Sequence, residues 1–326
     1  GCGVAKKFIL TALNNGKSVI TANKALLAQH GEELFTAAEE HGVDLYYEAS
    51  VGGGIPVIKA LREGLAANRI SKIFGILNGT CNYILTRMER DQESFEAVLK
   101  DAQAAGYAEA DPSFDINGND TAHKASILAS LAFGHWYGAD KVHVEGIREA
   151  TLADSQSARD LGYRIKLLAV IKQDDNSVEL RVQPSLVLAD SLLGNVNDVF
   201  NAIWVEGNYV GPTMFYGRGA GRDATASAVV ADIVDIGRNL VFDSTVRVPG
   251  FRVHAEAKPI RPMDQIQSRY YVRIQASDRV GLLANITRVF SDERVSISTL
   301  SAKDPSRIII LTNSSNEHSV RAACQK

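Results

Sequence analysis

The segment 106–124, GYAEADPSFDINGNDTAHK, concentrates ionisable side chains that could act on a small polar molecule. It is rich in Gly, Pro, Asp and Asn, which favour turns, and turns would bring its carboxylates together ahead of the single lysine, Lys124. Converging carboxylates could hold an ammonium group. The four carboxylates are Glu109, Asp111, Asp115 and Asp120.

Asp120 and Lys124 stand four residues apart in a segment that begins a helix near Asn119. This spacing places both side chains on one helix face, within reach of each other. An exposed ion pair is the commoner meaning of such spacing. The alternative is a lysine that transfers a proton, for which burial lowers a lysine pKa and a neighbouring carboxylate raises it. Spacing alone leaves both interpretations open.

A second lysine, Lys24, follows a short apolar strand at residues 17–21. Periodicity predicts helices at 5–14 and 32–40 and a second strand at 43–49, which together form a βαβ unit. Such a unit predicts a parallel sheet of the nucleotide-binding kind, and open sheets of this type bind ligands at the carboxyl ends of their strands. Lys24 is therefore a candidate catalytic residue, although a solvated lysine at a helix start is the alternative.

Two glycine-rich segments follow strand-like residues. SVGGGIP leads into a helix expected from Pro56 to residue 67, and GRGAG precedes a helix expected at 224–237 with apolar positions at Val229, Val230, Ile233 and Ile236. Backbone N–H groups at such a helix start favour anions or polar ring substituents. An ordinary helix start capped by Asp223 is the alternative for the second segment.

The central part of the chain predicts a second, more antiparallel sheet. A strand is expected at 71–77, a hairpin at 164–171 and 178–184, and further strands around Trp204 and Phe215. Residues 242–268 show little periodicity and predict a linker. Beyond it, the expected order is strand, helix, strand, strand and the start of a helix.

Composition excludes several classes of protein. The 326 residues carry a formal net charge of −3, without a Lys/Arg-rich run, which disfavours nucleic acid as a partner. No apolar run approaches the roughly 20 residues of a membrane-spanning helix, so no membrane association is expected. Three distant cysteines do not form a disulfide framework. We expect a cytoplasmic protein with reduced thiols.

The pattern of 106–124 resembles the homoserine dehydrogenase segment G-Y-x-E-x-D-P-x-x-D-x-x-G-x-D-x-x-x-K at every specified position. The resemblance implies NAD- or NADP-dependent interconversion of L-homoserine and L-aspartate 4-semialdehyde, on the route to threonine, methionine and isoleucine. It implies that Glu109 and Asp120, with Asp115, bind the substrate, and that Lys124 gives or takes the proton at the reacting oxygen.

The same resemblance extends over nearly the whole chain through T-A-N-K, N-G-T-x-N-Y-I-L and G-x-G-A-G, although Ala224 stands where the family has proline. It implies that Lys24 lies between cofactor and substrate. It also implies a structural sodium ion bound by backbone carbonyls. The implied cofactor-binding residues are Lys24, Gly106, Gly221, Asn78 and Thr80. The implied sodium ligands are Glu48, Val51, Gly53 and Ile55.

Residues 269–326 resemble the ACT domain, a βαββαβ module, without its final strand. The resemblance implies an amino-acid effector, with threonine the natural hypothesis, and a homodimer or homotetramer. The implied effector site comprises Asp278, Gly281, Leu282 and Asn285.

The expected fold class is α/β, with a partial Rossmann-type nucleotide-binding domain at 1–50 and an α+β catalytic and dimerisation domain with a mixed sheet at 51–241. The helix at 224–237 is expected to pack back on the first domain. A linker at 242–268 and an incomplete ACT domain at 269–326 complete the organisation. Since the chain opens inside a βαβ unit without an initiator Met, we expect an upstream segment.

Two rival hypotheses remain at this stage. If the molecule begins at Gly1, the missing G-x-G-x-x-G turn predicts poor cofactor binding and a non-catalytic amino-acid-binding regulator, which a cofactor titration would reveal. The second rival is a thioester-forming semialdehyde dehydrogenase with Cys81 as its nucleophile. An inert, buried Cys81 is favoured over that role, because no local motif supplies a histidine to activate it.

Overall fold

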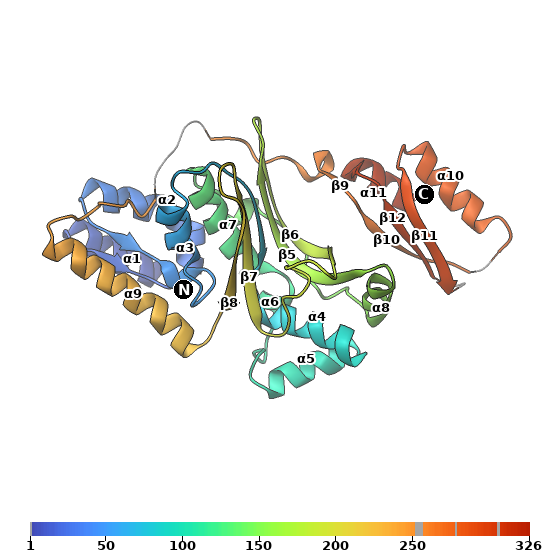
Figure 1. Cartoon of the computed structure of the whole chain (residues 1–326), viewed down its shortest axis with the longest axis horizontal. Coiled ribbons are helices and arrows are strands. Elements are labelled where there is room, and N and C mark those ends of the chain that lie inside the picture. Colours follow the sequence, from blue (N-terminus) through green and yellow to red (C-terminus); the bar gives the residue numbers. More distant parts are fainter. Residues whose placement is uncertain (1, 252–256, 278, 305–306) are drawn as a thin grey trace. The chain divides into compact units, whose positions relative to one another are not determined.

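A computed structural model describes residues 2–251, 257–277, 279–304 and 307–326. The chain forms two compact units, Gly1–Pro259 and Ile260–Lys326 (Figure 1). The second unit begins inside the segment 242–268 that was predicted to be a linker. Within the described part of the chain, no helix is both long enough and apolar enough to cross a membrane.

The first unit opens with a parallel two-stranded βαβ arrangement, in which Val19 pairs with Leu45 and Ile20 with Tyr46. Helix α2 connects the two strands. It begins at Lys24 rather than near residue 32, because Asn23 caps it by accepting a hydrogen bond from the Leu26 N–H. The elements are α1 (Cys2–Asn14), β1 (Val19–Ile20), α2 (Lys24–Glu40) and β2 (Leu45–Tyr46).

Helix α2 changes direction at His30, whose backbone leaves helical geometry at φ −133° and ψ 15°. A side chain on the next residue, Gly31, would overlap the Trp136 ring, with its Cβ only 1.8 Å from a ring carbon. The missing side chain therefore lets the ring lie against the helix.

The segment after β2 is less regular than its sequence predicts. Residues Glu48–Ser50 form a 3₁₀ turn, α3 covers only Val57–Lys59, and a π-helical turn at Ala60–Gly64 continues it. The predicted strand at 43–49 is thus shortened to two residues, and the predicted helix ends before residue 67.

A six-stranded mixed sheet forms the centre of the first unit, with the order β4-β6-β5-β3-β7-β8. Only the β4–β6 pair is parallel; the other neighbours are antiparallel. Strand β3 lies inside the sheet, between β5 and β7. The strands are β3 (Ile70–Ile76), β4 (His143–Val144), β5 (Tyr163–Gln173), β6 (Val178–Leu188), β7 (Phe200–Gly207) and β8 (Gly211–Arg218).

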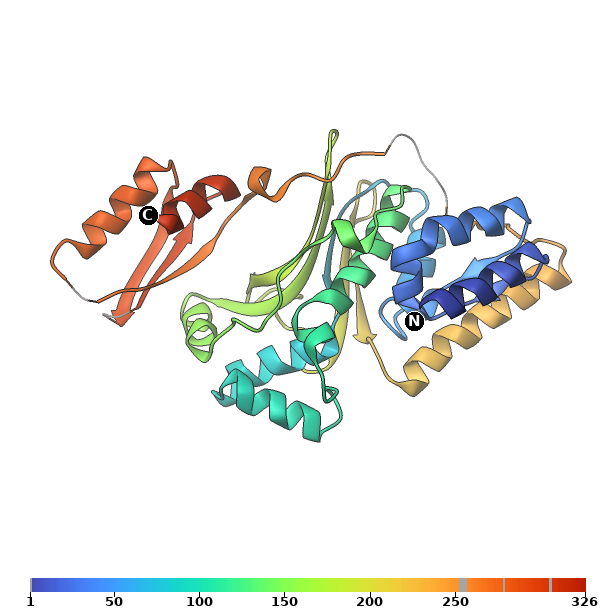
Figure 2. The same ribbon diagram turned by 180° about the vertical axis from the view of Figure 1, so that it is seen from behind.

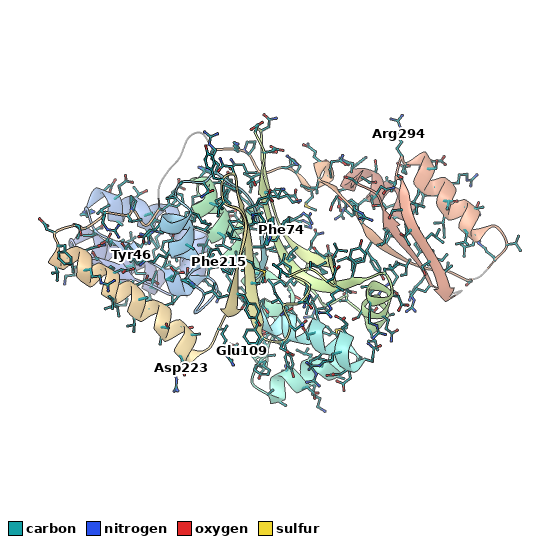
Figure 3. All side chains as sticks on the ribbon, viewed as in Figure 1. Tyr46, Phe74, Glu109, Phe215, Asp223 and Arg294 are labelled. Atoms are coloured by element: carbon teal, nitrogen blue, oxygen red, sulfur yellow. The ribbon has the colours of Figure 1, made fainter. Side chains whose placement is uncertain are left out.

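Helices α4, α7 and α8 pack against this sheet, as the two opposite views show (Figures 1 and 2). Apolar residues of the strands meet those of a loop in one buried cluster that includes Ile76, Val170 and Val196. Phe74, which is labelled in Figure 3, packs against Trp204 on the neighbouring strand, with ring centroids 5.3 Å apart. The helices are α4 (Gly79–Asp91), α5 (Phe95–Ala104), α6 (Ser113–Ile116), α7 (Asn119–Phe133) and α8 (Leu152–Asp160).

The last helix of the first unit, α9 (Arg222–Val241), packs against the βαβ elements. Asp232 accepts a hydrogen bond from the Glu48 N–H, and Asn239 donates to Asp44. The predicted apolar face was partly wrong, because Val230 and Ile233 are 55% and 52% exposed. The buried positions are instead Ala228, Asp232, Ile236 and Asn239, so polar contacts fix much of this interface.

The second unit contains a three-stranded antiparallel sheet of order β10-β12-β11. Phe290, Val295, Ile308, Ile310, Val320 and Ala323 form its buried core, which joins the sheet to both helices of the unit. Strand β9, which follows the 3₁₀ turn Met263–Gln265 in the chain, forms a short antiparallel pair with β13. The elements are β9 (Gln267–Ser268), β10 (Tyr271–Gln275), α10 (Leu282–Asp292), β11 (Ile297–Asp304), β12 (Arg307–Thr312), β13 (Ser315–Asn316) and α11 (Glu317–Gln325).

Candidate functional site

Asp120 lies at the centre of a buried cluster of charged side chains. It is only 5% exposed, and its Oδ2 lies 2.7 Å from the Nζ of Lys124, itself 9% exposed. Its other oxygen, Oδ1, lies 3.2 Å from the Nζ of Lys24. One carboxylate therefore binds two ammonium groups. The exposed ion pair considered from spacing alone is excluded.

Helix α7 fixes the relation between Asp120 and Lys124. Gly118 precedes the helix with φ +88°, and a Cβ there would lie 2.9 Å from a methyl group of Val144. Glycine thus permits both the left-handed turn and the close approach. The helix then places Asp120 in its first turn and Lys124 one turn later, on the same face.

Lys124 has a second acceptor, the Leu77 carbonyl at the end of β3, 2.7 Å from its Nζ. Two of the three N–H groups of its ammonium are therefore engaged, one by Asp120 and one by the Leu77 carbonyl. Among the described residues no third acceptor bonds to Nζ, so the third N–H is available to a bound molecule.

Lys24 is the first residue of α2 and follows β1, so it stands at the carboxyl end of a parallel strand. Its side chain is 34% exposed, whereas that of Asp120 is 7% exposed. Lys24 therefore contacts Asp120 from the end of this strand, and its catalytic role stays a prediction. A partly exposed lysine thus pairs with a buried carboxylate.

Asn78 connects Asp120 to a second carboxylate. Its amide nitrogen lies 2.8 Å from Asp120 Oδ2 and 2.7 Å from Asp115 Oδ1. Its amide oxygen accepts a hydrogen bond from the Cys81 N–H at 2.8 Å and so caps α4. Asp115 lies on α6, a short helix inside the segment 106–119 that was predicted to be a loop.

The two carboxylates differ in their pKa. Burial alone would raise the pKa of Asp120, but the charges of Lys124 and Lys24 and the hydrogen bonds from Lys124 and Asn78 lower it to about 2. Burial raises the pKa of Asp115 above its ordinary value, although the hydrogen bond from Asn78 opposes this effect. Asp120 is therefore a permanent anion at neutral pH.

Three further predicted residues lie in the segments around this cluster. Glu109 has an exposed side chain, and its carbonyl accepts a hydrogen bond from Gln103 (Figure 3). Among the described contacts, the Glu109 side chain does not join Asp120. Gly106 follows the C-cap residue of α5 with φ +76°, and Thr80 donates to the Tyr107 carbonyl at 2.6 Å.

The two glycine-rich segments contact each other directly. A Cβ on Gly53 would lie 2.6 Å from the backbone of Gly219, and the Gly54 N–H donates to the Arg218 carbonyl. Gly221 is the N-cap residue of α9, with φ +113° and open space where a side chain would be. The alternative of an Asp223 cap is wrong, since α9 has no side-chain cap.

The predicted sodium ligands lie in the same loop, and their supposed donors are backbone carbonyls. The Ile55 carbonyl accepts the Val57 N–H at 2.8 Å. The Glu48 carboxylate accepts the N–H groups of Ile58 and Lys59, and burial raises its pKa to about 7. In the described part of the chain, no group of three His, Cys, Asp or Glu side chains is arranged for a metal.

The predicted effector residues belong to the second unit. Gly281 is the N-cap residue of α10 with φ +86°, and its carbonyl accepts the Asn285 N–H. Leu282 packs against the core of the unit. Asp278 lies outside the described residues.

Cys81 is fully buried in the first turn of α4. Its thiol lies 3.3 Å from the Asp115 carbonyl. Burial, together with the charges of Asp115 and Asp120, raises its pKa well above the ordinary value. A nucleophile must be an accessible thiolate, so this environment opposes the thioester role.

Sequence reasoning missed three groups at this site: the Leu77 carbonyl, the double contact of Asn78, and His123. The Nδ1 of His123 is buried and has no partner among the described residues, while its ring lies edge-on against Phe114. Burial lowers the pKa of His123. Its spacing of three residues from Asp120 could have indicated a common helix face.

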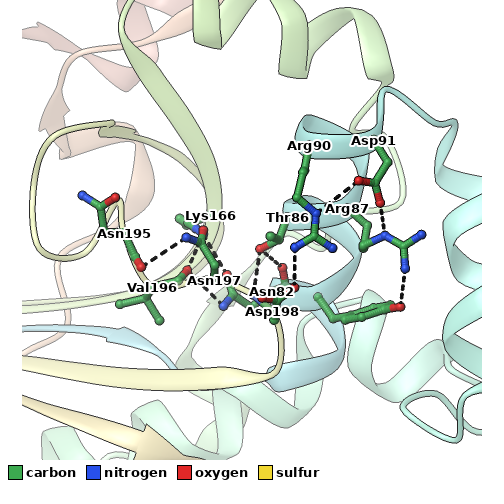
Figure 4. A network of polar contacts seen from close by, with 11 residues as sticks. Asn82, Thr86, Arg87, Arg90, Asp91, Lys166, Asn195, Val196, Asn197 and Asp198 are labelled. Carbon is green, nitrogen blue, oxygen red and sulfur yellow. Dashed lines mark hydrogen bonds and ion pairs between the residues drawn. The ribbon is translucent and has the colours of Figure 1, made fainter.

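A buried lysine in β5 hydrogen-bonds to α4, the helix that Asn78 caps. Lys166 is 1% exposed and donates to the amide oxygen of Asn82 at 3.1 Å and to the Val196 carbonyl (Figure 4). The Asn82 amide in turn donates to the carbonyls of Val196 and Phe200, each at 3.1 Å. Helix α4 is thus tied to β5 and to the segment before β7.

We predict that Lys166 makes the free energy of unfolding increase with pH in the alkaline range. Burial lowers the pKa of Lys166 to about 8 from its ordinary 10.5. Between these values the unfolded chain binds more protons than the folded one, so raising the pH favours the folded state. In Lys166→Met, urea unfolding should lack this gain of about 1 kcal/mol per pH unit near pH 9.

Lys100→Met is the control, because it removes one positive charge from an exposed position on α5. An identical pH slope of unfolding in the wild type and Lys166→Met would contradict the prediction.

The parallel βαβ unit, with a lysine at its strand end beside a buried carboxylate–lysine cluster, is the arrangement expected of an oxidoreductase that uses a nicotinamide nucleotide. Residues 2–48 match the family model "Homoserine dehydrogenase, NAD binding domain", and residues 56–234 match the model "Homoserine dehydrogenase". The chain belongs to the homoserine dehydrogenase family.

Individual relatives agree with this assignment. A homoserine dehydrogenase of Neisseria gonorrhoeae is 48% identical over 99% of this chain and 76% of its own length. A solved homoserine dehydrogenase from Thiobacillus denitrificans is 47% identical, with a TM-score of 0.95 over 99% of this chain and 75% of that one. A hyperthermophilic archaeal homoserine dehydrogenase in complex with NADPH is 30% identical, with a TM-score of 0.64 over 72% and 68%.

Proposed function

We propose that this protein interconverts L-homoserine and L-aspartate 4-semialdehyde with NAD or NADP, and that Lys124 moves the proton at the reacting oxygen. The observation that carries the proposal is the buried position of Lys124 between Asp120 and the Leu77 carbonyl. These two acceptors orient Nζ, and its remaining N–H can bind the substrate oxygen.

In the reductive direction, Lys124 donates a proton to the carbonyl oxygen of the semialdehyde as it becomes a hydroxyl. In the oxidative direction, the neutral amine of Lys124 takes the hydroxyl proton. Asp120 stabilises the ammonium form and holds Lys24 beside it, so a developing negative charge on the substrate oxygen faces cations.

The carboxylates would bind the amino group of homoserine. Oδ2 of Asp115 faces no donor among the described residues, and Asp120 lies next to it across the Asn78 amide. We propose that Asp115 and Asp120 accept N–H groups from the substrate ammonium, with Glu109 contributing from the exposed loop before α6.

The cofactor would lie at the carboxyl end of β1, beside Lys24 and the N-terminus of α9. The residues fit such a group, because Gly221 leaves open space at a helix start and α9 has no side-chain cap there. When bound, the nicotinamide supplies the hydride acceptor or donor. Gly106 and Thr80 are proposed to border the ring.

We also propose a bound sodium ion, regulation by an amino acid and an oligomeric assembly. The carbonyls of Glu48, Val51, Gly53 and Ile55 would coordinate sodium, whose preference for oxygen ligands supports the choice. The unit from Ile260 would act as an ACT domain that responds to threonine near Gly281 and Asn285. We further propose a cytoplasmic homodimer or homotetramer.

Homoserine-dependent reduction of NAD or NADP, followed at 340 nm, tests the proposed activity. We predict that the wild type reduces the cofactor and that Cys81→Ser retains turnover within about threefold, since a buried thiol of raised pKa is no nucleophile. Loss of homoserine oxidation in Cys81→Ser, with an unchanged unfolding temperature, would instead support thioester chemistry. Absence of activity in the wild type would refute the proposal.

A further inference from the structure

Asn78 is fixed at its position by three hydrogen bonds of its side chain. It is 5% exposed and lies between the end of β3 and the start of α4. Its amide oxygen accepts the Cys81 N–H, which can only donate, so the NH₂ group must point the other way. Both of its hydrogens then meet carboxylates, one on Asp115 and one on Asp120.

This arrangement leaves the Asn78 amide with no donor for a cofactor, because an amide NH₂ carries only two hydrogens. The contact with nicotinamide implied by family resemblance would therefore have to break one of two bonds of 2.7 and 2.8 Å to buried or half-buried carboxylates. An unpaired buried acceptor costs more than a neutral hydrogen bond contributes.

The two carboxylates need such a donor. The charge of Asp120 raises the pKa of Asp115 by repulsion, and burial acts to raise the pKa of both carboxyls. The two lysines contact Asp120, whereas the hydrogen bond that lowers the pKa of Asp115 comes from Asn78. The groups facing Asp115 are thus Asn78 and Asp120 nearby, with the charges of Lys124 and Lys24 acting from a greater distance.

We propose that Asn78 is a positioning residue that holds Asp115 and Asp120 together as an ionised pair for the substrate ammonium. This inference rests on the proposed function, because it assigns the pair to ammonium binding. It replaces a cofactor-binding role of the Asn78 side chain with one that acts through two carboxylates.

Two substitutions separate this role from the capping of α4. Serine and aspartate both retain an acceptor for the Cys81 N–H, since both are good N-cap residues. Asn78→Ser removes both amide N–H donors without adding charge and leaves at most one O–H on a shorter side chain, whereas Asn78→Asp places a third carboxylate against the other two. Asn78→Ala removes donors and cap together, and thus shows the cost of the lost cap in thermal unfolding.

We expect Asn78→Ser to lower kcat/KM for homoserine by about tenfold to a hundredfold through misplaced carboxylates. Asn78→Asp should lower it further and move the acidic limb of the kcat/KM profile upward by about one pH unit. The KM for NAD or NADP should change little in Asn78→Ser. A raised cofactor KM with an unmoved acidic limb in both variants would overturn the proposal in favour of cofactor binding.

A second measurement is independent of activity. ¹³C-NMR titration of the aspartate carboxyls in cofactor-free protein, assigned with Asp115→Asn and Asp120→Asn, reports both pKa values directly. Both should rise in Asn78→Ser and rise further in Asn78→Asp; unchanged values would refute the positioning role. If the wild type fails to oxidise homoserine, the proposed function fails, yet this titration still decides whether Asn78 holds the pair.

Discussion

Lys124→Met is expected to lower kcat for homoserine oxidation by about 10²- to 10⁴-fold, the usual contribution of a positioned acid or base. Methionine retains the unbranched chain but cannot move a proton or donate a hydrogen bond. The Lys124 ammonium is the group held between Asp120 and the Leu77 carbonyl, so its loss removes the proton carrier of the proposed reaction. Steady-state kinetics in both directions measure the effect.

Lys124→Arg is the informative comparison. Arginine retains the positive charge beside Asp120 but is not deprotonated in proteins, so it should preserve substrate binding better than turnover. Near-normal kcat in Lys124→Met would exclude Lys124 from the chemistry. Near-normal kcat in Lys124→Arg alone would reduce its role to electrostatic attraction.

Asp120→Asn should have the second large effect, on stability and activity together. It leaves Lys124 buried without its carboxylate, and breaking a buried pair from one side costs about 3–5 kcal/mol. Both lysines would then face a neutral amide, and kcat/KM for homoserine should fall by about 10³-fold through lost orientation. Urea unfolding and steady-state kinetics of the same preparations measure the two effects.

The contribution of Asp120 to stability should also depend on pH in a definite direction. Since the folded protein lowers the pKa of Asp120 to about 2, its ionisation stabilises the fold above about pH 4, and that contribution is lost as the pH falls toward 2. Asp120→Asn should lack this acid-side loss. The exposed Asp101 on α5 supplies the control Asp101→Asn, and equal destabilisation by the two substitutions would contradict a buried pair.

Local patterns predicted the parts of the site that lie close together in the sequence. The spacing of Asp120 and Lys124 placed them on one helix face, and the apolar strand before Lys24 indicated a strand end. Burial of the pair was not predictable from spacing, because it depends on strands β3, β5 and β6 packing against α7.

Local sequence patterns could not predict contacts between segments that lie far apart in the chain. Asn78 meets Asp115 and Asp120 across 37 and 42 residues of chain, and Lys166 meets Asn82 across 84. Alternation in β5 gives no reason to expect a charged side chain at a fully buried position. In α9, helical periodicity placed Val230 and Ile233 inward, whereas polar contacts through Asp232 and Asn239 set the buried face.

The close approach of Gly53 to Gly219 joins two loops that lie far apart in the sequence. These two segments lie closer together than any side chain would allow, and the bond from the Gly54 N–H to the Arg218 carbonyl crosses the same junction. Any residue with a Cβ at position 53 would overlap the Gly219 backbone, so the close packing of the two loops depends on glycine. A substitution at Gly53 would therefore push the loop after β2 away from the loop that leads into α9.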